Sequence, residues 1–540
     1  MPRRAIHRRR GVRLAAVAFL VAGVVVGAAG GMGGAGAAAP GPAPQSLLDA
    51  IQRVTSQPRY ANTTFGFQVR DRDTGEVLFD QNGNLMFVTG SILKVFSNAK
   101  ALDSYGPDYR FRTPVYRTGA VHQGRLRGDL VLVGSGDLSL GLREKPGDTM
   151  VYNSAPEFDH TYANAAPGAV PVDGDPLAGL DSLARQVADS GIHRVRGDVV
   201  IDDRLFDTFS GWPDAAVSPI TPIWVNENRI DITSTPTEVG RRAALDFRPK
   251  TAAYTVRTNV TTGPAGSETD IAVSRPEPGV FQVSGTIAAD AGPILRVGEI
   301  PDPAAFARTA FIEALARAGV TVDAPATGPN PRDRLPTEGS LSRSERVAVH
   351  VSAPLSQFTK VILKTSHNPG ADLMACLDAV AAGSKDCAAG LVAEAAYAKR
   401  VGVPDDQLFI FDGAGSDERD HATSTAMTSF LRGLDGQAIG PAFERSLSLL
   451  GVDGTIADAI PANSPAAGKV RAKDGARAAA APNGVGIVTA RTLVGYADAK
   501  SGRRLLLTVM FANVPFRSFA DVSAIVNDNG EIAAAMQQAF

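Results

Sequence analysis

SILKVFSNA, residues 91–99, decides how this chain is interpreted, because its apolar residues recur at helical spacing. A helix over this stretch places Ser91 and Lys94 one turn apart on a single face. A serine hydroxyl is a poor nucleophile without a base within hydrogen-bonding distance, and a lysine whose pKa is lowered by burial can be that base. The start of the helix also favours negative charge developing at Ser91. Because SxxK alone is common, an N-capping serine followed by a surface lysine stays the alternative.

Two more short motifs follow in the order that such a site requires. SHN, residues 366–368, opens a second helical run, and KDG, residues 473–475, lies on a predicted strand. Each motif is weak by itself, but SxxK, SxN and KxG in this order form the signature of penicillin-recognising serine enzymes. We therefore expect Ser91, Lys94 and Lys473 to converge on one groove.

The chain resembles the class C low-molecular-mass penicillin-binding proteins, the D-alanyl-D-alanine carboxypeptidase/endopeptidase family of SxxK serine peptidases. Beyond the three motifs, the stretches that carry the resemblance are GPDYRFRT (106–113), LVGSGDLSL (132–140), GDVVIDDRLF (197–206), Asn226-Glu227-Asn228, DGAGS (412–416) and GVDGTI (451–456). The resemblance implies an α/β (α+β) fold, in which a penicillin-binding/β-lactamase-like transpeptidase domain is split by inserted β-rich sequence.

Local patterns agree with a split fold. Alternating residues predict a hairpin of strands over 65–69 and 77–79, and further strands are predicted over 489–497 and 504–513 near the other end. Short β-like runs among turn residues fill the middle of the chain. The predicted parts are a signal peptide (1–39), a first transpeptidase-like part (40–119), one or two inserted β-rich domains (120–345) and a second transpeptidase-like part (346–540).

The resemblance also implies roles for individual residues. Ser91 would be the acylated nucleophile, Lys94 its general base, and Ser366 a relay that passes a proton to the leaving amine. The backbone N–H groups of Ser91 and Ala476 would form the oxyanion hole. This chemistry needs no metal ion or organic cofactor, and the seven histidines lack the HxH or HxxxH spacing of a zinc peptidase.

Substrate binding would fall to the remaining motif residues. Asn368 would hold the substrate amide, while Lys473 and Gly475 would line the place of the substrate's terminal carboxylate. His367 is expected to be a loop residue beside the cleft, without a catalytic role.

The third motif departs from the family's Lys-Thr-Gly, because Asp474 stands where the threonine is expected. An ionised aspartate cannot donate the threonine's hydrogen bond, and it adds repulsion near the substrate's carboxylate. On an ideal strand Arg477 shares a face with Lys473 and would offer a compensating guanidinium. Asp474 would then point away. The outcomes left open are an active enzyme with altered preference, a weak enzyme, and a peptidoglycan-binding relative without turnover. A β-lactamase or esterase is disfavoured by the large insertion.

The N-terminus has the layout of a secretory signal peptide. Basic residues over 3–13 precede an uncharged run over 14–29 and a run of small residues that ends at 37–39. We expect export to the cell envelope or beyond, with an uncleaved membrane anchor as the alternative. The net charge of −2 does not indicate a nucleic-acid partner. The expected partners are peptidoglycan peptide stems, at D-Ala-D-Ala termini or cross-links, and β-lactams.

The only two cysteines are Cys376 and Cys387. In an oxidising compartment they would pair across a helix–turn–helix whose turn is residues 383–386. Two buried free thiols are the alternative.

Overall fold

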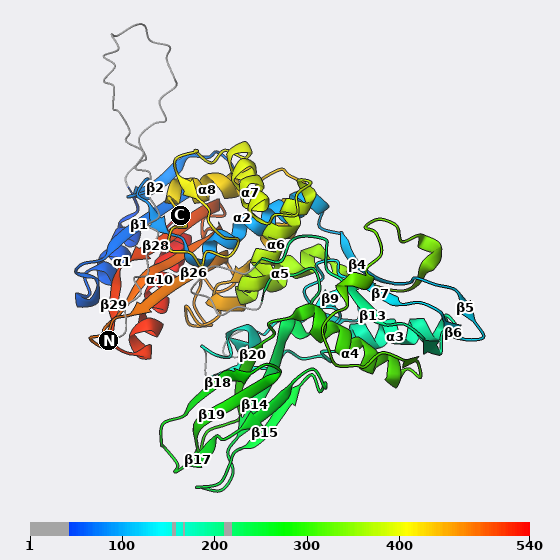
Figure 1. Cartoon of the computed structure of the whole chain (residues 1–540). Helices are drawn as coiled ribbons and strands as arrows, with labels where there is room; N and C mark the ends of the chain where they lie inside the picture. Colours follow the sequence, from blue (N-terminus) through cyan, green and yellow to red (C-terminus); the bar gives the residue numbers. More distant parts are fainter. Residues whose placement is uncertain (1–42, 154–157, 166–167, 210–218) are drawn as a thin grey trace, which may run out of the picture. The chain divides into compact units, whose positions relative to one another are not determined.

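Strands from both ends of the chain form one antiparallel sheet (Figure 1). Its path is β2-β1-β28-β27-β26-β25, and β29 pairs with β27. The strands are β1 (Thr64–Asp71), β2 (Val77–Gln81), β25 (Ser448–Leu449), β26 (Val470–Ala480), β27 (Gly486–Asp498), β28 (Arg504–Ala512) and β29 (Val514–Phe516). The predicted hairpin and C-terminal strands are therefore confirmed. Strand β26, which carries the third motif, continues to Ala480 because it pairs with β27 along its whole length.

The structure, a computed structural model, describes residues 43–153, 158–165, 168–209 and 219–540. The predicted signal peptide lies outside the described residues. Among the helices within these ranges, none combines the length and the apolar character that crossing a membrane requires.

Helices cover both faces of this sheet. On one face lie α1 (Gln45–Thr55) and α10 (Phe519–Ala539), and on the other lie α2 (Lys94–Tyr105) and α8 (Ser424–Gly433). Strand β28 shows why the sequence produces this arrangement. Its side chains alternate between the faces, with Leu505 and Leu507 in the α1/α10 core and Leu506 and Met510 in the α2/α8 core. A strand buried on both faces is largely apolar, and β28 is apolar from Leu505 to Ala512 except at Thr508.

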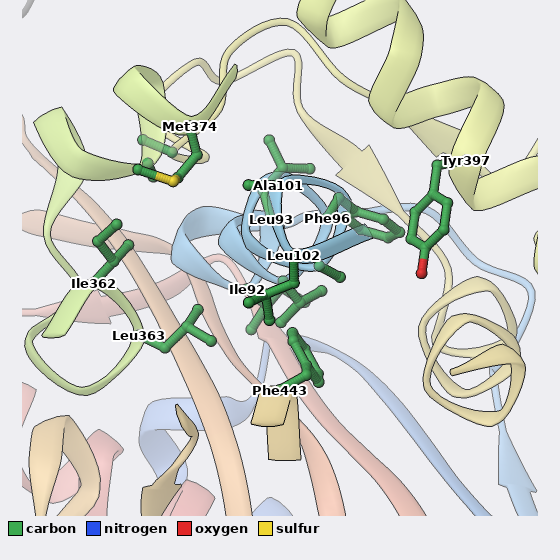
Figure 2. Packing of buried hydrophobic residues seen from close by; sticks show 14 of the residues in the cluster. Ile92, Leu93, Phe96, Ala101, Leu102, Ile362, Leu363, Met374, Tyr397 and Phe443 are labelled. Atoms are coloured by element: carbon green, nitrogen blue, oxygen red, sulfur yellow. The ribbon is translucent and has the colours of Figure 1, made fainter. Parts of the chain in front are cut away.

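Helix α2, which follows Ser91, is enclosed by other helices (Figure 2). Around it lie α5 (Leu355–Thr365), α6 (Asn368–Ala381), α7 (Ala388–Arg400) and α9 (Gly440–Ser446). The packed side chains include Ile92, Leu93, Phe96 and Leu102 near α2, with Ile362, Met374, Tyr397 and Phe443 from its neighbours. Burying one large apolar side chain contributes roughly 1.5–3 kcal/mol, so this core fixes the start of α2 firmly.

A disulfide joins Cys376 in α6 to Cys387, the residue before α7. It closes the helix–turn–helix that the sequence pattern predicted for this segment.

The middle of the chain builds separate sheets around a second core. One sheet has the order β13-β7-β4-β22, with α3 (Ala178–Asp189) and α4 (Pro303–Arg317) packed beside it. Its strands are β4 (Arg110–Arg117), β7 (Leu130–Val133), β13 (Val199–Asp202) and β22 (Arg346–Pro354). Smaller sheets use β14 (Arg229–Thr235), β15 (Ala244–Arg248), β16 (Thr255–Thr258), β17 (Thr261–Gly263), β18 (Asp270–Glu277), β19 (Val280–Ala288) and β20 (Ile294–Glu299).

Candidate active site

Ser91 and Lys94 meet at the start of α2. Ser91 lies in a single 3-10 turn, Gly90–Leu93, and α2 begins at Lys94. The sequence pattern placed Ser91 at the helix start. In the structure, Ser91 lies in the 3-10 turn that directly precedes the α-helix. The Lys94 Nζ lies 2.7 Å from the Ser91 Oγ and 2.7 Å from the carbonyl oxygen of Ala414. The amine is therefore within direct proton-transfer distance of the hydroxyl.

The surroundings of Lys94 favour its neutral form. The side chain is completely buried, and this burial, helped by the positive charge of Lys473, lowers its pKa to about 7. The carboxylates of Asp412, Asp372 and Asp474 oppose the shift without cancelling it. A large fraction of the molecules then carries an unprotonated amine at neutral pH, which is what a general base requires.

Glycines let strand β26 approach the turn that holds Ser91. A Cβ on Gly475 would lie 2.7 Å from the backbone nitrogen of Ser91 and 2.6 Å from the carbonyl oxygen of Thr89. A Cβ on Gly90, where φ is 52°, would lie 3.1 Å from the backbone nitrogen of Ala476. The backbones at Ser91 and Ala476 are thus close neighbours, the arrangement in which two N–H groups can stabilise one oxyanion.

The SxN motif bridges two helices. Ser366 ends α5 in the left-handed conformation, with φ of 58°, and Asn368 is the first residue of α6. The Asn368 Nδ2 donates to the Ser416 Oγ at 3.2 Å, and the hydroxyl of Tyr162 donates to the Ser366 carbonyl. A left-handed residue other than glycine costs energy and is typical of functional positions.

One loop, residues 412–416 (DGAGS), connects the first two motifs to strand β26, which carries the third. Its Ala414 carbonyl receives the Lys94 hydrogen bond, its Ser416 Oγ receives that of Asn368, and the Ser416 carbonyl accepts from Arg477. The loop is itself held by the Asp412 carboxylate, which accepts backbone N–H groups of four following residues, 414–417. Side chains from α2, α6 and β26 are therefore assembled around a single rigid turn.

The ideal-strand argument predicted that the Asp474 side chain points away from Lys473, and this prediction is wrong. The Lys473 Nζ donates to Asp474 Oδ1 at 3.1 Å and to the Asp474 carbonyl at 2.6 Å. Arg491, on the neighbouring strand β27, donates to Asp474 Oδ2 at 2.7 Å, and Thr455 donates to Oδ1. Curling of the long Lys473 side chain along its own strand makes the first contact possible.

These contacts balance the negative charge of Asp474, which the sequence analysis expected to repel the substrate's carboxylate. Burial alone would raise the pKa of Asp474, but Lys473 and Arg491 hold it well below the usual range. The carboxylate is therefore ionised and balanced by two buried cations. Arg477, expected to supply the compensation, instead donates to Ser416 and is partly exposed.

His367 is not a loop residue beside the cleft but the buried N-cap of α6. Its Nδ1 accepts the Gly370 backbone N–H at 2.9 Å, so the proton sits on Nε2, which lies 2.6 Å from Glu227 Oε2. Burial lowers the pKa of His367, which keeps the ring neutral. Glu227 also contacts Arg143 and, at 2.9 Å, His160.

Sequence reasoning therefore missed several residues that hold the site together. Thr455, Asp412 and Glu227 lie in stretches that carried the family resemblance, which was the available signal for them. Arg491 gave no local signal, because its place beside Asp474 depends on the register of β26 against β27, in which residue 476 faces 491.

A serine and a lysine within hydrogen-bonding distance at the start of a helix, packed against an antiparallel sheet, are the arrangement of penicillin-recognising serine enzymes. The sequence pattern of the D-Ala-D-Ala carboxypeptidase 3 (S13) family matches residues 47–531, and the chain belongs to that family. It is therefore a serine-type D-Ala-D-Ala carboxypeptidase related to the class C penicillin-binding proteins, as the sequence motifs predicted.

Individual relatives agree with this assignment. The chain is 27% identical over 453 residues to the D-alanyl-D-alanine carboxypeptidase of Actinomadura sp. (strain R39), covering 79% of this chain and 76% of that protein. It is 21% identical over 410 residues to the carboxypeptidase DacB of Haemophilus influenzae, covering 72% and 75%. The crystal structure of penicillin binding protein 4 (dacB) from Haemophilus influenzae has a TM-score of 0.68 at 18% identity, covering 91% of this chain and 99% of that one. The predicted α/β penicillin-binding fold is confirmed.

Proposed function

We propose that this chain is exported and removes or cuts at D-Ala in peptidoglycan peptides through an acyl-Ser91 intermediate, and that penicillins acylate the same serine. The observation that carries the proposal is the 2.7 Å contact between the Lys94 Nζ and the Ser91 Oγ, combined with a pKa of about 7 for Lys94. A buried amine at this distance removes the hydroxyl proton as the serine oxygen forms its bond to carbon.

The proposed first half-reaction uses the residues of all three motifs. Lys94 takes the Ser91 proton while the Oγ attacks the carbonyl carbon of the penultimate D-Ala, and the N–H groups of Ser91 and Ala476 stabilise the oxyanion. The peptide C–N bond then breaks, and the leaving amine receives a proton relayed through Ser366. Asn368 holds the substrate amide. Water attacks the acyl-enzyme in the second half-reaction, which releases the shortened peptide and restores the serine.

Recognition of the substrate's terminal carboxylate would depend on the third motif. The positive charges of Lys473 and Arg491 balance Asp474, so this aspartate does not leave an isolated negative charge beside the substrate. This balance favours an active enzyme over a peptidoglycan-binding relative without turnover. Arg477 and Gly475 complete the proposed substrate-binding set, with Arg477 at the loop that holds Asn368.

The domain boundaries stay part of the proposal. The catalytic part would comprise residues 40–119 and 346–540, and the inserted part residues 120–345. Strands β4 and β22 flank residues 120–345 and pair antiparallel, but β4 also pairs with β7, so their sheet is shared with the inserted part. Export rests on the signal-like N-terminal sequence, and a substrate in the cell envelope agrees with it.

Release of D-alanine from a peptide ending in D-Ala-D-Ala tests the proposal. We expect wild type to release D-alanine, and Ser91→Ala to abolish it. Ser446→Ala is the matched control, because Ser446 is a buried serine whose hydroxyl donates to the Ala442 carbonyl within its own helix, α9, and it should release D-alanine as wild type does. Equal activity in wild type and Ser91→Ala would overturn the proposal. A cross-linked peptide dimer, assayed in parallel, separates carboxypeptidase from endopeptidase action.

A further inference from the structure

A second group of side chains outside the active site has the composition of a metal site. Asp137 lies in the loop after β7, Glu144 in the short strand β8 (Glu144–Lys145), and His350 in β22. One carboxylate oxygen from each acid and a ring nitrogen of His350 lie within 4.8 Å of one another. Asp137 and His350 are buried, and Glu144 is partly exposed.

The two distances from His350 to the carboxylates are longer than charge-assisted hydrogen bonds and match the spacing of metal ligands. The His350 Nε2 lies 3.4 Å from Asp137 Oδ2 and 3.5 Å from Glu144 Oε1. A charge-assisted hydrogen bond between nitrogen and carboxylate is about 2.7–2.9 Å long. Two ligands of a tetrahedral zinc ion, each about 2.0–2.1 Å from the metal, are about 3.3 Å apart.

His160 shows how a histidine without a metal ion is hydrogen-bonded between two carboxylates in this protein. His160 also faces two carboxylates, but its nitrogens lie 2.8 Å from Asp231 Oδ1 and 2.9 Å from Glu227 Oε2, both normal hydrogen bonds. In contrast, His350 Nε2 and Asp137 Oδ2 are buried atoms for which the described part of the chain provides no hydrogen-bond partner. Leaving such atoms unpaired is costly, and a bound cation would satisfy both.

The remaining atoms of the two carboxylates are already oriented by other bonds. Asp137 Oδ1 accepts backbone N–H groups of Ser139 and Leu140 at 3.1 and 3.0 Å, which leaves Oδ2 directed toward His350. Glu144 Oε1 accepts the backbone N–H of Ala353 at 2.9 Å and has a further lone pair. Outer hydrogen bonds of this kind orient the ligands of established metal sites.

The charge and chemistry of the group select the ion. While no ion is bound, Asp137 and Glu144 outweigh burial and raise the pKa of His350 to about 10, so zinc binding must displace the ring proton. The two carboxylates and the deprotonated imidazole then carry a charge of about −2, which a divalent cation balances. Mg²⁺ and Ca²⁺ prefer ligand sets made of oxygen alone, whereas Zn²⁺ accepts mixed nitrogen and oxygen ligands. We propose that Asp137, Glu144 and His350 bind one Zn²⁺ ion, with water in the fourth position, at a site separate from the catalytic serine.

The position of this site explains what the ion would do. Glu144 is bonded to Ala353, just before α5, the helix that ends at Ser366. The loop of Asp137 also contacts α6, since a Cβ on Gly370 would lie 3.1 Å from the side chain of Leu138. Zinc would therefore clamp together the segments that carry both helices of the SxN motif, without participating in the reaction.

Isothermal titration of chelator-treated full chain with ZnCl₂ tests this proposal. We expect one Zn²⁺ per wild-type chain and an upward shift of the melting midpoint. Asp137→Asn and His350→Gln should weaken binding at least about tenfold and remove the shift. His193→Asn is the control, because it removes an exposed histidine and should bind zinc as wild type does.

Three results of the zinc titration would overturn the proposal. Zinc that does not bind, that binds equally to wild type and the ligand variants, or that binds no better than Mg²⁺ or Ca²⁺ would leave His350 as part of an ordinary ion pair. Circular dichroism checks that the variants are folded, and Glu144→Gln replaces any of them that is not. Visible absorption of the Co²⁺-loaded protein would show four-coordinate geometry independently of catalytic activity.

Discussion

Replacing Asp474 by asparagine removes one buried negative charge from between two cations. Its oxygens lie 3.1 Å from Lys473 Nζ and 2.7 Å from Arg491 Nη1, and both cationic side chains are nearly inaccessible to solvent, at 0% and 4% exposure. At an effective dielectric constant of about 20, each contact corresponds to about 5–6 kcal/mol of Coulomb attraction. Most of this Coulomb attraction is offset by the free-energy cost of removing the charges from water. We expect Asp474→Asn to lower the free energy of unfolding by about 3–5 kcal/mol, because both cations stay buried without their partner.

Urea denaturation at pH 7 measures this loss, with Asp405→Asn as the control. Asp405 pairs with Lys399 at 2.6 Å, but both side chains are about two-thirds exposed, at 65% and 67%. Removing that pair should cost less than about 1 kcal/mol. The Asp474 loss should persist at 1 M salt, because buried pairs are screened little. If Asp474→Asn is no less stable than Asp405→Asn, the aspartate is not the buried counterion described above.

Three further predictions concern the same site and its supports. The penicillin acylation rate should rise with pH and level off above about 7, where Lys94 has lost its proton, and Lys94→Arg should lower it by at least about 10²-fold, measured by stopped-flow labelling. Gly475→Ala should destabilise the fold by about 1–3 kcal/mol and slow acylation, since its Cβ would lie within 2.7 Å of two backbone atoms, whereas Gly292→Ala, with open space around its Cβ, should change neither. Because Asp231 and Glu227 outweigh burial and raise the pKa of His160 to about 9, its stabilisation is complete below pH 6.5 and is lost as the pH rises through about 9. The stability difference between wild type and His160→Gln should shrink over that range, and a constant difference would contradict the shift.

Local patterns were enough to predict most strands of the main sheet and the contact between Ser91 and Lys94. Strand alternation and helical spacing act over a few residues, so the hairpin near residue 70, strand β28 and the one-turn separation of Ser91 and Lys94 follow from neighbouring letters alone. The order of the three motifs indicated the other candidate residues, because that order matches the signature of penicillin-recognising serine enzymes.

The partners of charged side chains were beyond such patterns. His367 meets Glu227, which lies 140 positions away, and Asp474 meets Arg491 through strand register. The expectation that Asp474 points away assumed a side chain perpendicular to an ideal strand, but Lys473 is long enough to curl back to its neighbour. Contacts of this kind depend on tertiary packing, which the spacing of residues along the chain does not encode.

Mass spectrometry of the penicillin-treated protein tests the central claim most directly. The account predicts that the intact mass increases by one penicillin, that the added mass maps to the peptide containing Ser91, and that Ser91→Ala prevents the increase. A label on any other residue, or an increase that survives in Ser91→Ala, would contradict it.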